Sequence, residues 1–347
     1  IPRNSISFCF FNLFHGVSNC MKALQLEKSL NTLIALNQPC FVWGGVGIGK
    51  SEIVHKVASS LGYTVRDVRV ALLDPVDLRG VPSVADGITV WNPPVFLPTE
   101  DDPKTLLFLD ELPHGSPSVQ NALFQLIKDR QLGEYTLPES TVIVSAGNRL
   151  QDRAGANRVN TALGDRFIHL NLEPCPEEWV SWALNSGRII PEVINYIRYS
   201  PENIFVFDTN AQVNTTPRSW EYASRILANK PDSDIEQELL SGTIGEGISA
   251  ELVGYLRTCR KLPSIESILK NPEKIDLDSD PAVMYAICGI VARKMNKENI
   301  GKFVDFLKTL PDEFAVLCMN DATTMNPELK KTKEYIDFDV AYQDITL

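Results

Sequence analysis

The sequence lacks several features that would assign it to a familiar class at once. It has no run of about 18 apolar residues, so no membrane-spanning helix is expected. Its seven cysteines are odd in number, lie far apart and include no C-x-x-C pair, which argues against a disulfide framework and against a zinc site. The four histidines also lack the spacing of metal ligands. This cysteine usage favours a reducing, cytoplasmic compartment.

Positive charge is scarce as well. The net charge is -11 and the isoelectric point is near 5.0. A protein with this balance has no broad basic surface for a duplex, so nucleic acid is not an expected partner. The chain has 347 residues, 44% of them hydrophobic and 22% charged. That composition is typical of a globular protein, and the length exceeds what one hydrophobic core usually supports, so two or three packed units are expected.

A glycine-rich octet is the most informative stretch that is present. It fits the phosphate-binding pattern G-x-x-x-x-G-K-[ST], with an apolar, strand-like run before it and helical spacing after it. Such a loop turns successive backbone N–H groups inward, and the helix that follows directs its positive end at the same anion. We expect Lys50 to reach the β and γ phosphates and Ser51 to help hold Mg²⁺. The octet is Gly44, Gly45, Val46, Gly47, Ile48, Gly49, Lys50 and Ser51.

Apolar stretches with strand character alternate with helical ones in the first half of the chain. Two of them, 105–111 and 141–148, are apolar almost throughout, which is typical of central strands of a parallel sheet. The alternation predicts an α/β fold with a doubly wound, parallel, five-stranded sheet, whose ligands bind beyond the carboxyl ends of the strands. The five predicted strands are 39–43, 63–70, 105–111, 141–148 and 167–172.

The second half of the chain has helical periodicity. We expect helices at 177–187, 191–199 and 217–229, the last of them capped by Thr216, and a mostly helical remainder. Residues 81–98, punctuated by glycine and proline, indicate a hairpin-like insertion, which lines one face or the pore of an assembly or is a plain surface hairpin. The resulting organisation is a disordered arm or upstream extension at 1–20, a core at 21–174, a helical lid at 175–234 and a helical carboxyl-terminal region at 235–347.

An acidic pair, Asp110 and Glu111, ends the third predicted strand. Acidic residues at such a place often serve only to cap the next helix. In a chain with a phosphate loop, the pair has a second explanation. Asp110 can bind Mg²⁺, directly or through water, and Glu111 can polarise the water that attacks the γ phosphate. The combined pattern favours this catalytic assignment.

The order and spacing of these motifs resemble the AAA+ ATPases, and within them the MoxR-like branch, over about residues 22 to 230. The matching stretches read G-G-V-G-I-G-K-S at 44–51, D-L-R-G at 77–80, N-P-P at 92–94, L-F-L-D-E-L at 107–112, V-Q-N-A-L-F-Q-L-I-K-D-R-Q at 119–131, S-A-G-N at 145–148, A-L-G-D-R-F at 162–167 and T-P-R-S-W at 216–220. The resemblance implies an AAA+ core, ATP rather than GTP, and Mg²⁺.

The resemblance also implies roles for three further residues. Asn148 matches the polar residue, called sensor 1, that orients the attacking water, although a strand end can also hold an Asn as a turn residue. Arg166 matches the arginine finger that enters a neighbouring subunit's site, with an ordinary salt bridge as the alternative. Arg149, Arg153 and Arg158 lie near it in sequence and could take that role. Arg218 matches sensor 2, a γ-phosphate contact made in cis or in trans.

The expected function is therefore ATP hydrolysis between the subunits of a ring, expected to be a hexamer, that remodels or activates a protein client. The resemblance extends to AAA+ proteins encoded beside von Willebrand A domain proteins, which makes such a protein a candidate client. One alternative is a nucleotide-gated assembly module with little turnover. Another is a DNA-acting AAA+ loader or translocase. A small-molecule kinase also uses a phosphate loop, but rarely together with an acidic pair, a sensor Asn and a helical lid.

Overall fold

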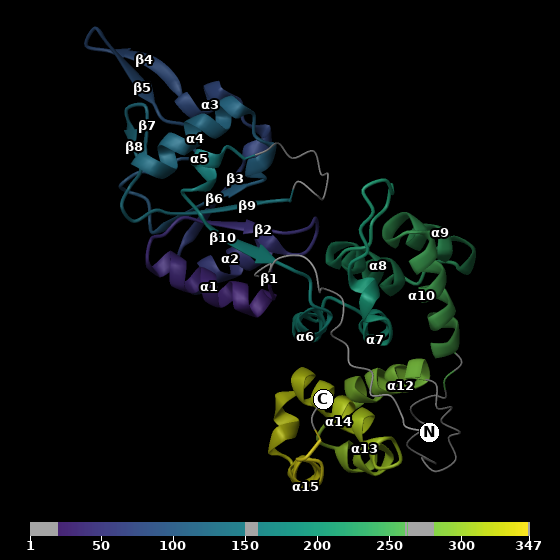
Figure 1. Cartoon of the computed structure of the whole chain (residues 1–347). Helices are drawn as coiled ribbons and strands as arrows, with labels where there is room; N and C mark the ends of the chain where they lie inside the picture. The colour runs from purple at the N-terminus through teal and green to yellow at the C-terminus, as the bar shows by residue number, and fades with distance from the viewer. Residues whose placement is uncertain (1–19, 150–158, 261, 263–280, 346–347) are drawn as a thin grey trace, which may run out of the picture. The chain divides into compact units, whose positions relative to one another are not determined.

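The computed structural model describes residues 20–149, 159–260, 262 and 281–345. These residues form two compact units (Figure 1). The first is an α/β unit that holds the chain up to residue 173, except for the tip of the glycine-rich loop. The second is a helical unit that holds that tip, 46–49, and the chain from residue 174 onward. The predicted arm at 1–20 lies outside the described residues except for Cys20.

The α/β unit is built on a parallel sheet. The five predicted strands are present and stand in the order β10-β2-β9-β6-β3, which confirms the doubly wound fold. The sheet has six strands and not five, because the short strand β1 (Cys20–Met21) pairs in parallel with the outer side of β10. The predicted strands are β2 (Cys40–Trp43), β3 (Thr64–Arg69), β6 (Thr105–Asp110), β9 (Val142–Gly147) and β10 (Ile168–Leu172).

Helices cover both faces of this sheet, as the apolar strands require. In Figure 1, α1 (Ala23–Ala35) and α2 (Lys50–Ser60) lie on one face, and α4 (Pro117–Asp129) lies on the other. On the α4 side, Leu123 and Leu126 pack in one buried cluster with residues of β6 and β9. The start of α4 is capped by Ser116, whose hydroxyl accepts a hydrogen bond from the Val119 amide at 3.3 Å. Short elements complete the unit: η1 (Val70–Leu72), η2 (Leu112–His114), β7 (Gln131–Leu132), β8 (Tyr135–Thr136) and α5 (Thr161–Gly164).

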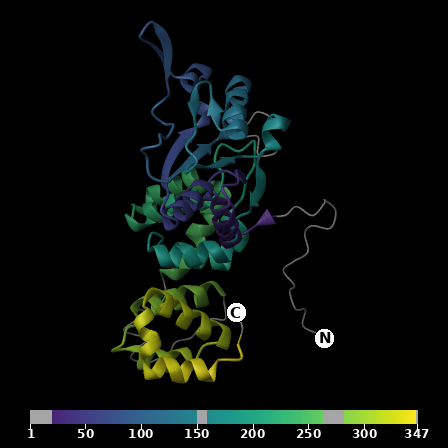
Figure 2. The ribbon, with the colours of Figure 1, turned by 90° about the vertical axis from the view of Figure 1, so that its left-hand side faces the viewer.

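The insertion forms a two-stranded ribbon that extends from the α/β unit (Figures 1 and 2). It consists of α3 (Pro75–Arg79), β4 (Val81–Ala85) and β5 (Ile88–Asn92), and β4 and β5 pair in antiparallel. The turn at Asp86 and Gly87 has positive φ at both positions, as an Asp-Gly hairpin turn requires. At the base, Gly80 has a φ of 80°, and a Cβ there would lie 2.0 Å from the carbonyl oxygen of Asn92. Only glycine fits that position.

The helical unit contains two hydrophobic clusters. The first joins α6 to α10 with Ala282 and Ala286 of α12, and the second joins the other buried hydrophobic residues of α12 to α13, α14 and α15. The first cluster includes residues on both sides of position 234, and the division into a lid and a carboxyl-terminal region stays a prediction. No described helix combines the length and the apolarity that crossing a bilayer requires. The helices are α6 (Pro176–Ser186), α7 (Pro191–Tyr199), α8 (Pro217–Ala228), α9 (Ser233–Ile244), α10 (Glu246–Cys259), α12 (Pro281–Lys294), α13 (Ile300–Leu307), α14 (Asp312–Met325) and α15 (Lys333–Ala341), with the short turns η4 (Pro201–Ile204) and η6 (Pro327–Lys331).

Candidate functional site: a nucleotide and magnesium site

Lys50 is the centre of the candidate site. It is the first residue of α2, directly after the glycine-rich loop, and only 9% of it is exposed. Its ammonium group donates to the carbonyl oxygens of Gly44 and Gly45, at 2.9 and 2.7 Å, and to Oδ1 of Asn148 at 2.9 Å. A buried ammonium needs such acceptors, and these hold its charge at the loop. The structure therefore brings together the loop lysine and the Asn at the tip of β9.

The next pair can hold a divalent cation. The Ser51 hydroxyl donates to Oδ2 of Asp110 at 3.0 Å, which joins the start of α2 to the carboxyl end of β6. A hydroxyl and a carboxylate are hard oxygen ligands, and Mg²⁺ usually takes only one or two protein ligands and completes its octahedron with water and phosphate oxygens. Among the described residues there is no group of three or more His, Cys, Asp or Glu that could hold a metal by themselves. Ser51 and Asp110 thus fit a magnesium ion that is bound together with a nucleotide.

Glu111 has an unusual backbone conformation. Its φ of 56° and ψ of 33° are left-handed, which a non-glycine residue adopts at some expense in strain. Its amide donates to Oδ1 of Asp110 at 2.9 Å, so the strained turn also orients the carboxylate of Asp110. The Glu111 side chain is exposed and makes no capping hydrogen bond to η2, although Glu111 occupies the cap position. The structure therefore does not support a capping role for this carboxylate.

The tip of the glycine-rich loop packs within the helical unit, against the start of α8. The Arg218 amide donates to the Gly47 carbonyl oxygen at 3.1 Å. Gly47 has a φ of 72°, and a Cβ on it would come within 2.7 Å of Oγ1 of Thr216. Thr216 and Ser219 form a reciprocal capping box at this helix start, so the predicted cap is confirmed. Arg218 is exposed beside the loop tip.

Arg166 lies between α5 and β10, and its side chain is exposed. Its guanidinium stands over the ring of Phe124 on α4, 5.9 Å from the ring centroid, and it forms no ion pair with any residue that the structure describes. The alternative candidate Arg149 is engaged elsewhere, because it pairs with Glu173 at 2.6 Å. Arg153 and Arg158 lie outside the described residues. A salt bridge at the strand start, the other explanation for Arg166, is not found among the described groups.

Two supporting arrangements have no motif of their own. Gln120 is 2% exposed, and its side chain donates to the Gly115 carbonyl at 3.1 Å and accepts from the Asn160 amide at 3.1 Å. Gln120 therefore connects the residue that follows η2 with the N-cap of α5, the short helix that precedes Arg166. The glutamine stands in the motif at 119–131, but only its burial would have identified this role.

The second arrangement supports the strand before the loop. The Trp43 indole donates to Nδ1 of His169 at 2.7 Å, and Nε2 of that ring faces the Gly164 carbonyl at 2.9 Å. His169 is thus held with its proton on Nε2. Phe41 stacks on Trp43 with ring centroids 4.0 Å apart. On the same strand, burial raises the pKa of the Cys40 thiol to about 12, so it stays protonated as a core side chain.

Comparisons with known proteins agree with this geometry. Residues 39–167 match the family model described as AAA domain (dynein-related subfamily). No curated protein sequence gives a significant match. Among solved structures, NtrX from Brucella abortus in complex with ADP is 13% identical with a TM-score of 0.42, over 95% of this chain and 68% of that chain. A single-residue mutant of RuvB from Thermotoga maritima is 17% identical with a TM-score of 0.37, over 73% of this chain and 75% of that chain.

The structural matches are too distant to support an argument about function, and the chain spans about two thirds of the NtrX chain. The family match does support one, because it covers the phosphate loop, the acidic pair, Asn148 and Arg166. These are also the residues, Arg166 apart, that the fold gathers at the carboxyl ends of β2, β6 and β9. Residues 39–167 therefore form an AAA domain, which hydrolyses ATP with the help of Mg²⁺.

Proposed function

We propose that the protein is a MoxR-like AAA+ ATPase that hydrolyses ATP between the subunits of a ring and uses the cycle to remodel or activate a protein client. The observation that carries this proposal is the state of Arg166. An exposed guanidinium, supported by an aromatic ring and free of a carboxylate partner among the described residues, is available to the nucleotide of a second copy. The isolated subunit then lacks one charge that phosphoryl transfer needs.

Each site residue has a distinct role in this proposal. Lys50 binds the β and γ phosphates, and Ser51 and Asp110 hold Mg²⁺, which supplies charge neutralisation on the phosphate oxygens. Glu111, whose exposed carboxylate has no partner among the described residues, polarises the attacking water, and Asn148 orients that water. Asn148 already accepts from the Lys50 ammonium, so its side chain lies beside the group that would bind the γ phosphate.

Two arginines complete the proposed site. Arg166 enters from the neighbouring subunit and offsets charge in the transition state. Arg218 is the proposed sensor 2, a γ-phosphate contact made in cis or in trans, and its side chain is exposed.

The proposed contact with a protein client is made by the ribbon of β4 and β5. Val84 and Ile88 are 79% and 68% exposed, and an apolar ribbon of this kind suits contact with another protein. We propose a hexameric ring in a reducing cytoplasm, with a von Willebrand A domain protein as the first client to test. The acidic net charge of -11 supports a protein client over DNA.

Subunit mixing tests the proposed site in trans. Lys50→Ala removes the lysine that binds the phosphates in the subunit's own site. Arg166→Ala removes the arginine finger that the subunit supplies to its neighbour's site. Each variant alone should have almost no ATPase activity. Mixed together, they create interfaces with Lys50 from one copy and Arg166 from another, so part of the activity should return. An Arg225→Ala protein, which changes an exposed arginine on α8, is the matched control and should keep full activity.

Two further measurements sharpen the result. Light scattering should show a larger mass with ATP than without it, and Lys50→Ala should abolish that difference.

Phosphate release should fall in Glu111→Gln by roughly a hundredfold or more, because a general base contributes about that much. Equal, low release from wild type and Glu111→Gln would instead indicate a nucleotide-gated assembly module. No recovery on mixing, with both variants folded, would refute the finger role of Arg166.

A further inference from the structure

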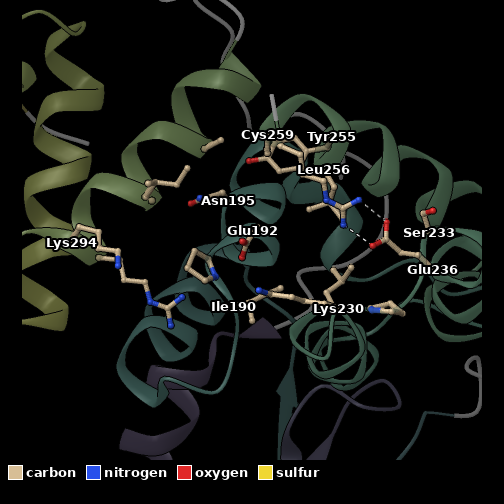
Figure 3. A pocket seen from close by; sticks show the side chains of 18 residues that line it. Ile190, Glu192, Asn195, Lys230, Ser233, Glu236, Tyr255, Leu256, Cys259 and Lys294 are labelled. Atoms are coloured by element: carbon tan, nitrogen blue, oxygen red, sulfur yellow. Dashed lines mark hydrogen bonds and ion pairs between the residues drawn. The ribbon is translucent and has the colours of Figure 1, made fainter. Parts of the chain in front are cut away.

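The helical unit contains a cavity of about 590 Å³ that none of the nucleotide-site residues lines. Its walls come from α7, from the connection between α8 and α9, and from α9, α10 and α12 (Figure 3). This volume lies within the range of sites that bind small molecules. Sequence patterns do not mark it, because its walls belong to helices far apart in the chain.

The cavity has an apolar body. Leu227 from α8, Leu256 from α10 and Ile290 from α12 line it, together with the backbone-restricting Pro191 and Pro231. Leu227 and Leu256 are 8% and 3% exposed, so the apolar wall belongs to the core of the unit and not to a shallow surface depression. A ligand with an apolar portion would gain about 25 cal/mol for each Å² of apolar surface that it buries there.

Buried polar groups line the same cavity, and one of them has no hydrogen-bond partner among the described residues. Asn195 is 3% exposed, lines the cavity, and makes no side-chain hydrogen bond to the residues that the structure describes. A Cβ at Gly289 would lie 2.1 Å from Nδ2 of Asn195, so glycine at 289 leaves the room that this amide occupies. The buried hydroxyl of Tyr255 also lines the cavity, next to the thiol of Cys259. A buried polar group without a partner destabilises a fold, and a ligand can supply the missing partner.

The charge around the cavity is positive. Lys230, Arg293 and Lys294 line it, and none of them forms an ion pair with a described residue, whereas Glu192 is the acid in the lining that is likewise not paired. The remaining charges, Arg260 and Glu236, neutralise each other through two hydrogen bonds of 3.0 and 2.6 Å. Figure 3 shows this paired couple on the α9 side of the cavity and Lys294 on the α12 side.

Tyr255 adds a hydrogen-bond donor to this set. Burial raises the pKa of its hydroxyl, so the group stays protonated and can donate to an acceptor on a ligand. The Asn195 amide can donate as well. Because three cations without an ion pair stand against the single unpaired acid Glu192 in the described lining, an anionic ligand fits this cavity better than a cationic one.

We propose that this cavity is a binding site for a small amphipathic anion, which is separate from the nucleotide site. The apolar body of the ligand lies between Leu227, Leu256 and Ile290. Its carboxylate, phosphate or sulfonate group faces Arg293 and Lys294, and its polar atoms pair with Asn195.

Two fluorescent probes with nearly the same rings test the charge preference. Anilinonaphthalene sulfonate carries an anion, and phenylnaphthylamine does not. The full chain should bind the sulfonate about tenfold more tightly, which corresponds to a net attraction from two partly solvated cations. Saturating ATP and Mg²⁺ should not displace it. Equal binding of the two probes, or displacement of the sulfonate by ATP, would overturn the proposal.

Three variants test the location. Arg293→Gln with Lys294→Gln should weaken sulfonate binding about tenfold and leave phenylnaphthylamine binding unchanged. The matched control is Arg257→Gln with Lys302→Gln, which removes the same charge from exposed positions outside the cavity and should change nothing. Ile290→Trp, at a half-buried lining position, should fill the cavity and abolish binding of both probes. Thermal unfolding would establish that each variant is folded, and unchanged sulfonate binding in the folded double variant would refute this site.

Discussion

The α/β unit and the helical unit use their buried polar residues in different ways. In the α/β unit, the polar groups at the carboxyl ends of the strands bond to one another around the phosphate loop, as Lys50 does with Asn148 and Ser51 does with Asp110. In the helical unit they join distant helices. Arg198 on α7 forms a two-point ion pair with Asp321 on α14, which is 3% exposed.

This difference predicts which substitutions change activity without changing stability, and which ones change stability first. The groups of the first kind lie at the edge of a sheet that is already stabilised by its apolar strands, so a change there affects chemistry first. Groups of the second kind lie between helices that depend on them for pairing, so a change there affects folding first. The following experiments test that distinction, from the largest expected effect to the smallest.

Removing one partner of the buried ion pair should have the largest effect. Arg198→Leu leaves the Asp321 carboxylate buried without its cation, and the unfolding free energy of the helical unit should fall by about 3–5 kcal/mol. Denaturant titration followed by circular dichroism measures it. Arg198→Leu combined with Asp321→Leu should recover most of the loss, because no uncompensated charge remains. If the double variant is as unstable as the single one, the charge is not the cause.

Lys50→Ala should reduce ATP hydrolysis by roughly a hundredfold to a thousandfold, the effect of deleting one preorganised donor to a developing negative charge. The unfolding transition of the helical unit should stay where it is in the wild type. Lys56→Ala is the control, since this lysine stands on the same helix, is exposed, and pairs with Glu27 away from the loop. A parallel loss of activity in Lys56→Ala would mean that α2 itself had been disturbed.

Substitutions in the two helix caps should have the smallest effects on stability, and the two effects should be about equal. Ser116→Ala in the α/β unit and Thr216→Ala in the helical unit should each lower the stability of their own unit by about 1 kcal/mol. If the units unfold independently, each variant shifts a different transition. A single transition that responds to both changes would show that the two units unfold together.

The sequence alone allowed much of the α/β unit to be predicted. Apolar strands, glycine at fixed positions and acids after a strand are local signals, and they located the loop, Asp110, Glu111 and Asn148. The strand at Cys20–Met21 was not predicted, because two residues carry no alternation. Its pairing with β10 depends on tertiary structure alone.

The supporting contacts could not have been predicted in the same way. Trp43 and His169 are 126 positions apart, and Arg198 and Asp321 are 123 apart. A single sequence contains no signal that links such partners, because each residue alone is typical of an ordinary surface or core position. Gln120 illustrates the same limit, since a glutamine on a helix usually faces solvent and its burial appears only once β6, α4 and α5 are assembled. The cavity of the helical unit depends on five separate segments for the same reason.

The ribbon of β4 and β5 has a practical consequence for handling the protein. Each of its strands has one edge without a partner in the sheet, and Val81, Val84 and Ile88 along it are each more than two-thirds exposed. Unpaired, apolar strand edges can pair with strands of other molecules, so we expect this ribbon to promote association of the purified protein at high concentration. Val84→Lys should reduce that association without changing the nucleotide site.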